Sequence, residues 1–221
     1  MGQSPLQQAI AQGHQQLIDA IEAMSLPSQV FEPDTPMLRQ GQSIDPLYWI
    51  DQGEFTLHYA AKNGKEFGIG IWRVEKRLFG EIELLTGECC QFDVVPLEPV
   101  TVRKLPRAQF EKLLLSEPNI ALWLSNQMAC HYQQQMHSAI RRSLYPLAHN
   151  IAEDLLKREQ QGLADMKGYQ EAARFGCGQR VYRRVIAQLI RQGLIEKRQG
   201  QLAITDRQRL TEFLEETANP L

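Results

Sequence analysis

The sequence contains little cysteine, no long apolar run and no excess of basic residues. Four cysteines among 221 residues are too few for a small fold held together by disulfides. No stretch approaches the roughly 18 consecutive apolar residues that suggest a membrane span. Residues 1–23 lack a basic segment followed by an apolar core, so no signal peptide is expected. These absences predict a soluble cytoplasmic protein whose thiols stay reduced, with no membrane partner.

The charge balance is slightly acidic, which taken as an average argues against a protein that binds polyanions. The formal net charge is -2, and hydrophobic and charged residues make up 43% and 23% of the chain, as in ordinary globular proteins. Between residues 167 and 209, however, ten basic residues stand against three acidic ones, a surplus of seven. With a total of -2, the remaining residues therefore carry -9. The basic charge is concentrated in one segment.

The first half of the chain changes from a helical to a strand-like pattern. Residues 6–24 have apolar side chains at helical spacing, and three prolines then predict a linker, namely Pro27, Pro33 and Pro36. Short runs rich in aromatic and β-branched residues follow at 48–50, 55–59, 67–72, 92–95 and 100–102. Turn signals separate them at 51–53, 63–64 and 86–87, and Asn63-Gly64 predicts a hairpin turn with positive φ at both residues. Short strands at this spacing are typical of an antiparallel barrel or sandwich.

A long helix is predicted from Pro118 to about Leu144. Small or apolar residues recur along it at steps of four or three, at Ala121, Ser125, Met128, Tyr132, Met136, Ala139 and Ser143. This spacing is typical of a seam between two helices. The alternative is a helix that packs only on its own domain. We favour a seam between two chains, because about 27 residues at 1.5 Å each reach roughly 40 Å, farther than a small barrel extends.

The segment after Pro146 contains a helix-turn-helix pattern. A first helix is predicted at 170–175, a turn at 176–178, and a second helix from Gln179. Ala172 is small enough for close helix packing, and Gly176 permits a sharp reversal of the backbone. The second helix is predicted to bury Val181, Val185 and Leu189, with Ile186 and Ile190 beside them. A hairpin at 194–204 and a helix from about Asp206 complete this part.

The opposite face of the second helix has the chemistry of a DNA-reading surface. It carries Gln179, Arg180, Arg183, Arg184 and Gln188. Arginine can bind guanine through two hydrogen bonds, and glutamine can bind adenine in the same way. Lys197 and Arg198 near the hairpin tip at Gly200 suit phosphate contacts. The alternative is a solvated helix face without a ligand.

Three stretches in this order resemble the Crp/Fnr family of bacterial transcription regulators. Residues 79–85 (FGEIELL) resemble its effector cassette, residues 124–129 (LSNQMA) its dimer helix, and Gly176-Cys177 followed by Arg184 its DNA-reading helix. The resemblance covers about residues 36–205. It implies an α+β chain with an antiparallel, jelly-roll-like β-roll effector domain, a long dimerisation helix and a C-terminal winged helix-turn-helix domain. The domains expected are an N-terminal helix at 1–27, the β-roll at 28–116, the dimerisation helix at 117–145 and the DNA-binding domain at 146–221.

The partners that the resemblance implies are double-stranded DNA, a second copy of the chain and RNA polymerase. The homodimer would bind near-palindromic sites. The dimer helix would contribute Ser125, Met128, Tyr132, Gln135, Met136 and Ala139.

The expected effector pocket departs from the cyclic-nucleotide-binding members of the family. Its candidates are Gly80, Glu81, Gln91, Phe92 and Gln135. Where those members have an arginine and a serine or threonine for the cyclic phosphate, this chain has Gln91 and Phe92. Glutamine lacks the positive charge that makes a bidentate phosphate contact strong. We therefore expect that cyclic AMP does not bind well, and the effector stays unassigned.

Two alternatives remain open from the sequence. Cys89 and Cys90 predict a redox- or metal-responsive regulator if they act with Cys130, His131 or His137, although an adjacent pair lacks common metal-site spacing. The cysteine cluster of the iron–sulfur branch is absent, and Cys177 is expected only to pack. The second alternative is a sensory module that has lost DNA binding. No metal site is assigned, and without a catalytic motif no enzyme is expected.

Overall fold

The computed structural model describes residues 4–161 and 168–218. Contacts divide the described chain into two compact units. The first comprises residues of Met1–Ala60 and Ile71–Gln134, and the second comprises residues of Ala61–Gly70 and Gln135–Leu221.

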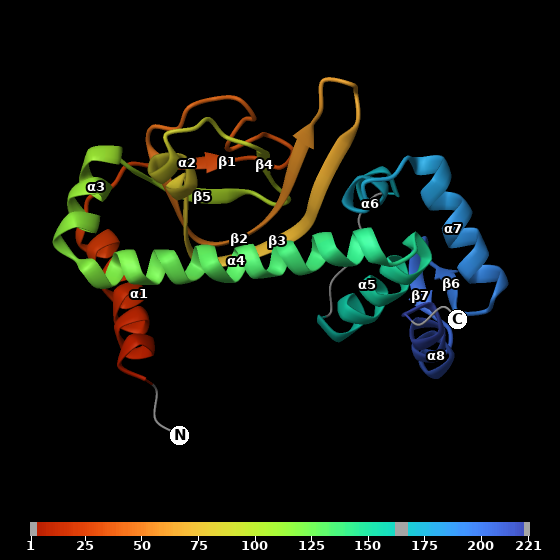
Figure 1. The fold of residues 1–221 in the computed structure, drawn as a ribbon. Coiled ribbons are helices and arrows are strands. Elements are labelled where there is room, and N and C mark those ends of the chain that lie inside the picture. The colour runs from red at the N-terminus through yellow and green to blue at the C-terminus, as the bar shows by residue number, and fades with distance from the viewer. Residues whose placement is uncertain (1–3, 162–167, 219–221) are drawn as a thin grey trace. The chain divides into compact units, whose positions relative to one another are not determined.

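The first unit is built on an antiparallel sheet (Figure 1). The strands are β1 (Ser28–Phe31), β2 (Leu47–Ala60), β3 (Glu66–Phe79), β4 (Asp93–Pro96) and β5 (Val100–Leu105). Their order is β1-β5-β2-β3, and β4 also pairs with β2. Strand β2 pairs with β5 over residues 47–50 and with β4 over residues 55–58. The predicted α+β class with an antiparallel core is confirmed.

Two of the turn predictions need correction. Residues 51–53 do not end a strand but lie within β2, between its pairings with β5 and β4. At the predicted hairpin turn only Gly64 has positive φ, and its N–H donates to the Ala61 carbonyl at 3.0 Å. The Ala61 N–H donates to the Lys65 carbonyl at 2.8 Å and closes the loop. Asn63 therefore does not need the left-handed conformation that a two-residue turn would impose.

Four helices accompany this sheet: α1 (Pro5–Ala23), α2 (Glu81–Thr86), α3 (Arg107–Ser116) and α4 (Pro118–Leu144). Helix α1 begins with a capping box in which Ser4 and Gln7 satisfy each other's backbone N–H. Helix α4 has the bounds that the sequence pattern predicted. The short helix α2, between two left-handed glycines at 80 and 87, was not predicted as a helix.

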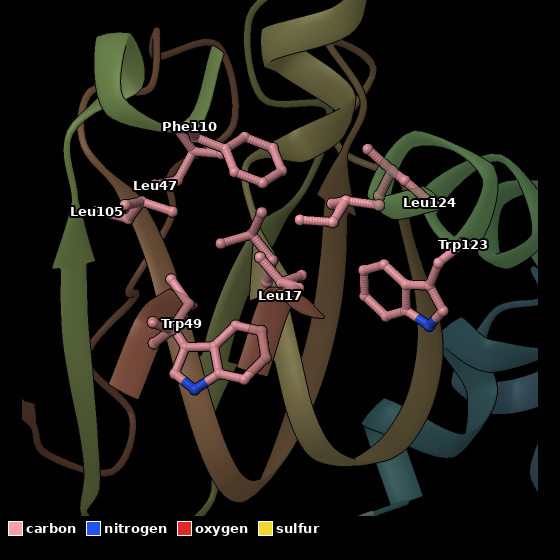
Figure 2. Packing of buried hydrophobic residues seen from close by; sticks show 10 residues of the cluster. Leu17, Leu47, Trp49, Leu105, Phe110, Trp123 and Leu124 are labelled. Atoms are coloured by element: carbon pink, nitrogen blue, oxygen red, sulfur yellow. The ribbon is translucent and has the colours of Figure 1, made fainter. Parts of the chain in front are cut away.

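The core of the first unit joins α1, α3 and α4 to the sheet (Figure 2). It consists of Leu17, Ile21, Leu47, Trp49, Leu78, Leu105, Phe110, Ile120, Trp123 and Leu124. Helix α1 lies close to the start of α4, because a Cβ on Gly13 would lie 1.8 Å from the Asn119 carbonyl oxygen. The His14 ring stacks on Trp123 with centroids 4.7 Å apart. The N-terminal helix is thus an integral part of this unit.

The second unit contains the C-terminal helices and a two-stranded hairpin. Its elements after α4 are α5 (Leu147–Gln161), α6 (Gly168–Arg174), α7 (Gln179–Arg191), β6 (Ile195–Arg198), β7 (Gln201–Ile204) and α8 (Arg207–Ala218). Their shared core includes Ile151, Ala172, Ile186, Leu189 and Leu210. In the parts of the chain that the structure describes, no helix is long and apolar enough to cross a membrane.

Candidate nucleic-acid interface and effector region

Helices α6 and α7 are joined by a tight turn at residues 175–178. The N–H groups of Gly176 and Cys177 donate to the carbonyls of Ala173 and Ala172 at 3.0 and 3.1 Å. Gly176 has φ +63°, in the left-handed region where a side chain is strained. Ala172 is buried at 2% exposure, which agrees with its predicted role in close packing. Cys177 packs beside the same core, as expected, and burial raises its pKa.

The buried stripe of α7 differs from the predicted one by a rotation of the helix. Tyr182, Ile186 and Leu189 are buried, whereas Val181 is exposed at 39% and Val185 is half-buried. The Tyr182 ring stacks on Phe175, with centroids 6.1 Å apart. An aromatic ring covers more apolar area than valine, so burying Tyr182 outweighs burying Val181.

All five predicted side chains on α7 are exposed: Gln179, Arg180, Arg183, Arg184 and Gln188. Arg183 donates to the Gln179 side-chain oxygen at 3.4 Å. No carboxylate of the described residues lies within ion-pair distance of Arg180 or Arg184. At the hairpin, Gln199 and Gly200 both have positive φ and form the tip. Lys197 is exposed beside it, and Arg198 pairs with Glu196 at 2.5 Å.

A buried ion network that the sequence did not predict fixes α6 against α5. Glu171 on α6 is 5% exposed and contacts Arg158 at 2.5 Å and Arg174 at 2.8 Å. Arg174 also pairs with Asp154 on α5 at 2.6 Å. Sequence patterns miss such a network, because its members are up to 20 positions apart and each resembles an ordinary surface charge. The network positions the first helix of the helix-turn-helix.

The predicted effector residues have different surroundings in the first unit. Gly80 and Glu81 are buried at the start of α2, whereas Gln91 is exposed. The Phe92 ring lies edge-on to the Tyr59 ring, with ring centroids 6.2 Å apart. Among the described residues, no hydrogen bond joins Gln91 to Glu81. Gln135 is exposed and belongs to the other unit.

Glu81 is engaged by a buried arginine that the sequence did not single out. Arg77 on β3 is 7% exposed, and its Nη2 donates to Glu81 Oε1 at 3.2 Å. Its Nη1 donates to Gln127 Oε1 on α4 at 3.0 Å, and Nη2 also contacts Nδ1 of His131 at 3.3 Å. Burial raises the pKa of Glu81, while Arg77 acts in the opposite direction. The sequence carried no signal for this role, since Arg77 directly follows Glu75 and Lys76 and resembles part of an ordinary surface charge run.

The adjacent cysteines differ in exposure. Cys89 is exposed, and Cys90 is buried with its N–H donating to the Gln42 carbonyl at 2.8 Å. Burial raises the pKa of the Cys90 thiol to about 11, and the charge of Glu83 adds to this effect. A thiol with this pKa is protonated at neutral pH and reacts slowly as a nucleophile. Across the described residues, no group of three or more histidine, cysteine or acidic side chains could hold a metal ion.

The outer face of α4 carries apolar side chains without cover from this chain. Ile120, Trp123 and Leu124 are buried against the sheet. Tyr132 and Met136, both predicted for the seam, are exposed at 66% and 41%. Of the other predicted seam residues, Ser125, Gln135 and Ala139 are exposed and Met128 is half-buried. A row of large exposed apolar side chains on one helix is typical of an interaction surface.

Known proteins are similar to this chain both over the residues of the sheet and over most of its length. Residues 28–117 match the family model of the cyclic nucleotide-binding domain. The regulatory protein YeiL of Escherichia coli O157:H7 is 24% identical over 175 residues, which cover 79% of this chain and 80% of that protein.

Two solved structures show the same fold. The c-di-GMP-responsive global regulator CLP of Xanthomonas campestris has a TM-score of 0.72 at 14% identity, covering 86% of this chain and 98% of that one. A Crp/Fnr-family regulator from Eubacterium rectale has a TM-score of 0.72 at 15% identity, covering 96% and 98%. The resemblance that the motifs indicated is confirmed at the level of the fold: residues 28–117 match the cyclic nucleotide-binding domain, and the chain shares the fold of these two regulators.

Proposed function

We propose that this chain is a homodimeric, sequence-specific DNA-binding regulator of transcription. The observation that carries the proposal is the exposed face of α7, where three arginines and two glutamines follow a helix-turn-helix turn and are opposed by a buried apolar stripe. The solved Crp/Fnr relatives support it through their shared fold.

The residues of α7 and of the hairpin would have different roles on DNA. Gln179, Arg180 and Arg184 lie in the first half of α7, the part of a recognition helix that reaches base edges in the major groove. Arg183 would bind a base or a phosphate. Lys197 and Arg198 would contact phosphates, which position the protein without reading sequence.

Dimerisation would occur along the exposed face of α4. Tyr132 and Met136 would lose their exposed apolar surface at a two-fold seam. The small side chains of Ser125 and Ala139 would allow close approach, and the half-buried Met128 would add apolar surface. A symmetric dimer would read two half-sites about one helical turn apart. RNA polymerase would be a further partner, on a surface that we do not assign.

The predicted effector pocket lacks a free arginine for the phosphate of a cyclic nucleotide. Gln91 offers no charge, and the charge of Arg77 is already matched by Glu81. We therefore expect cyclic AMP to bind poorly. A redox response through Cys90 is disfavoured by its raised pKa, since the reactive species is the thiolate.

A binding assay with two arginine variants tests the function. Wild-type protein first selects its site from random double-stranded DNA, and the affinity of Arg184→Ala for that site is then measured by gel shift. Loss of one base contact costs about 1–3 kcal/mol, so the affinity should fall about 5- to 150-fold. The matched control is Arg207→Ala, an exposed arginine on α8, which should bind nearly as wild type.

The salt dependence separates this function from a sensory module that does not use DNA. A DNA-binding protein loses affinity steeply as salt rises, because phosphate contacts release counterions. If the wild type selects no site and shows no salt-dependent affinity, the proposal is wrong. If selection succeeds and Arg184→Ala binds unchanged, the assignment of the reading helix is wrong.

A further inference from the structure

In the first unit, Arg77 joins three elements of the fold. Its guanidinium binds Glu81 on α2 and Gln127 and His131 on α4, while Arg77 itself belongs to β3. The Trp72 ring, also on β3, lies 5.2 Å from the His131 ring and 5.4 Å from the Arg77 guanidinium carbon. Gln127 and His131 are one helical turn apart on α4. The cluster therefore attaches one face of α4 to the sheet.

The attachment depends on the protonation state of His131. Nδ1 can accept the Arg77 N–H only when it carries no proton, so the neutral ring must hold its proton on Nε2. A second proton would place an N–H and a positive charge on Nδ1, facing the guanidinium. The hydrogen bond would then be lost, and two like charges would lie about 3 Å apart.

The charged groups around His131 predict that protonation of its ring breaks the contact with Arg77. Arg77 on β3 faces the His131 ring directly. The carboxylate of Glu81 on α2 is paired with Arg77 and does not contact the ring. Gln127 on α4 and Trp72 on β3 carry no charge. Burial, and then the charge of Arg77, lower the pKa of His131 below its ordinary value of 6.5. Arg77 Nε is buried and has no acceptor among the described residues, so loss of the His131 contact would leave a further donor of this buried guanidinium without an acceptor.

We propose that His131 is a proton-sensitive latch, which holds α4 on β3 through Arg77 when neutral and releases it when protonated. The pH direction follows from proton binding. The latched state takes up the proton less readily than a free imidazole, so acidification below about pH 6.5 disfavours that state, and the latch is intact above this pH. Helix α4 continues past residue 134 into the second unit, so a change in its attachment is carried along one continuous helix. The latch would act in the same way whether or not the chain binds DNA.

The test follows Trp72 and His131 by NMR in the full chain between pH 8 and pH 5. Wild type should show the His131 ring titrating below pH 6.5 and the Trp72 indole signal shifting with the same midpoint. In His131→Gln, which keeps an uncharged acceptor, the Trp72 step should disappear. The control is His137→Gln, an exposed histidine two turns further along α4, which should keep the step.

Hydrogen exchange at pH 7.5 supplies a second readout. His131→Phe keeps a ring against Trp72 but cannot accept the Arg77 bond, so amides of residues 124–134 should exchange about tenfold faster than in wild type. His131→Gln should remain close to wild type. The proposal is wrong if the Trp72 signal does not change with pH in wild type, or if it titrates unchanged in His131→Gln. It is also wrong if the amides of residues 124–134 exchange equally fast in His131→Phe and wild type.

Discussion

Individual basic residues on the candidate DNA surface differ in what they can recognise. Arg180 and Arg184 project from α7 without a carboxylate partner among the described residues, which leaves their planar donor groups available for base edges. Lys197 lies on the hairpin and presents a compact charge suited to a phosphate. Arg198 is held by Glu196, which lowers its expected contribution.

This difference predicts distinct effects on affinity and specificity. Lys197→Ala should weaken binding to the selected site and to scrambled DNA about equally, and should reduce the salt slope by about one. Arg180→Ala should weaken the selected site by about 1–3 kcal/mol while affecting scrambled DNA much less. Fluorescence anisotropy on both DNAs over a salt series measures these values. A Lys197→Ala variant that loses only the selected site would contradict the assignment.

Sequence patterns did not identify two residues correctly, one in the buried stripe of α7 and one in the first unit. Helical spacing identified α7 and its polar face, but it selected Val181 instead of Tyr182 for the buried stripe. The two choices differ by one position in phase, and only the packing of Tyr182 on Phe175 decides between them. Arg77 was missed for a related reason, since its partners on α2 and α4 are brought to it by the fold.

At the scale of whole elements, α1 illustrates how one small residue controls helix packing. Glycine usually weakens a helix by about 1 kcal/mol relative to alanine. At position 13, however, an added Cβ would lie 1.8 Å from the Asn119 carbonyl oxygen and 2.9 Å from the Ile120 nitrogen. These atoms belong to the backbone of α4 and cannot move aside alone. The packing cost therefore exceeds the helix-propensity gain.

Gly13→Ala should consequently destabilise the protein despite the better helix former. We expect the free energy of unfolding to fall by about 1–3 kcal/mol, as for other overpacked positions, measured by urea unfolding. The neighbouring exposed substitution Gln12→Ala is the control and should change stability by less than about 0.5 kcal/mol. A Gly13→Ala protein as stable as wild type would show that α1 does not lie this close to α4.

At the scale of the whole molecule, the notable surface is the outer face of α4, which exposes large apolar side chains. Tyr132, Met136, Ile140 and Leu144 are all large, apolar and exposed. They recur every four residues and so follow one side of the helix. This face is distinct from the one that buries Trp123 and Leu124 in the first unit.

The dimer proposal predicts that charges on this face separate the subunits. Tyr132→Glu combined with Met136→Glu should reduce the mass in sedimentation equilibrium from twice 25.3 kDa to 25.3 kDa. Desolvating paired carboxylates at the seam is unfavourable, whereas Gln133→Glu on the polar side should leave the dimer intact. Circular dichroism checks that the helices persist. A wild type that sediments as a monomer at micromolar concentration would rule out the dimer.

The sequence by itself determined the order of elements, the long helix, the helix-turn-helix and the polar face of α7, because these follow from local spacing and turn chemistry. It also showed that basic charge is concentrated near the C-terminus although the net charge is only -2. Only the tertiary structure decided the Arg77 cluster, the Glu171 ion network, the phase of α7 and the continuity of β2 through residues 51–53. Each of these depends on partners far apart in the chain, whose approach is set by packing and burial and leaves no periodic signal in the sequence.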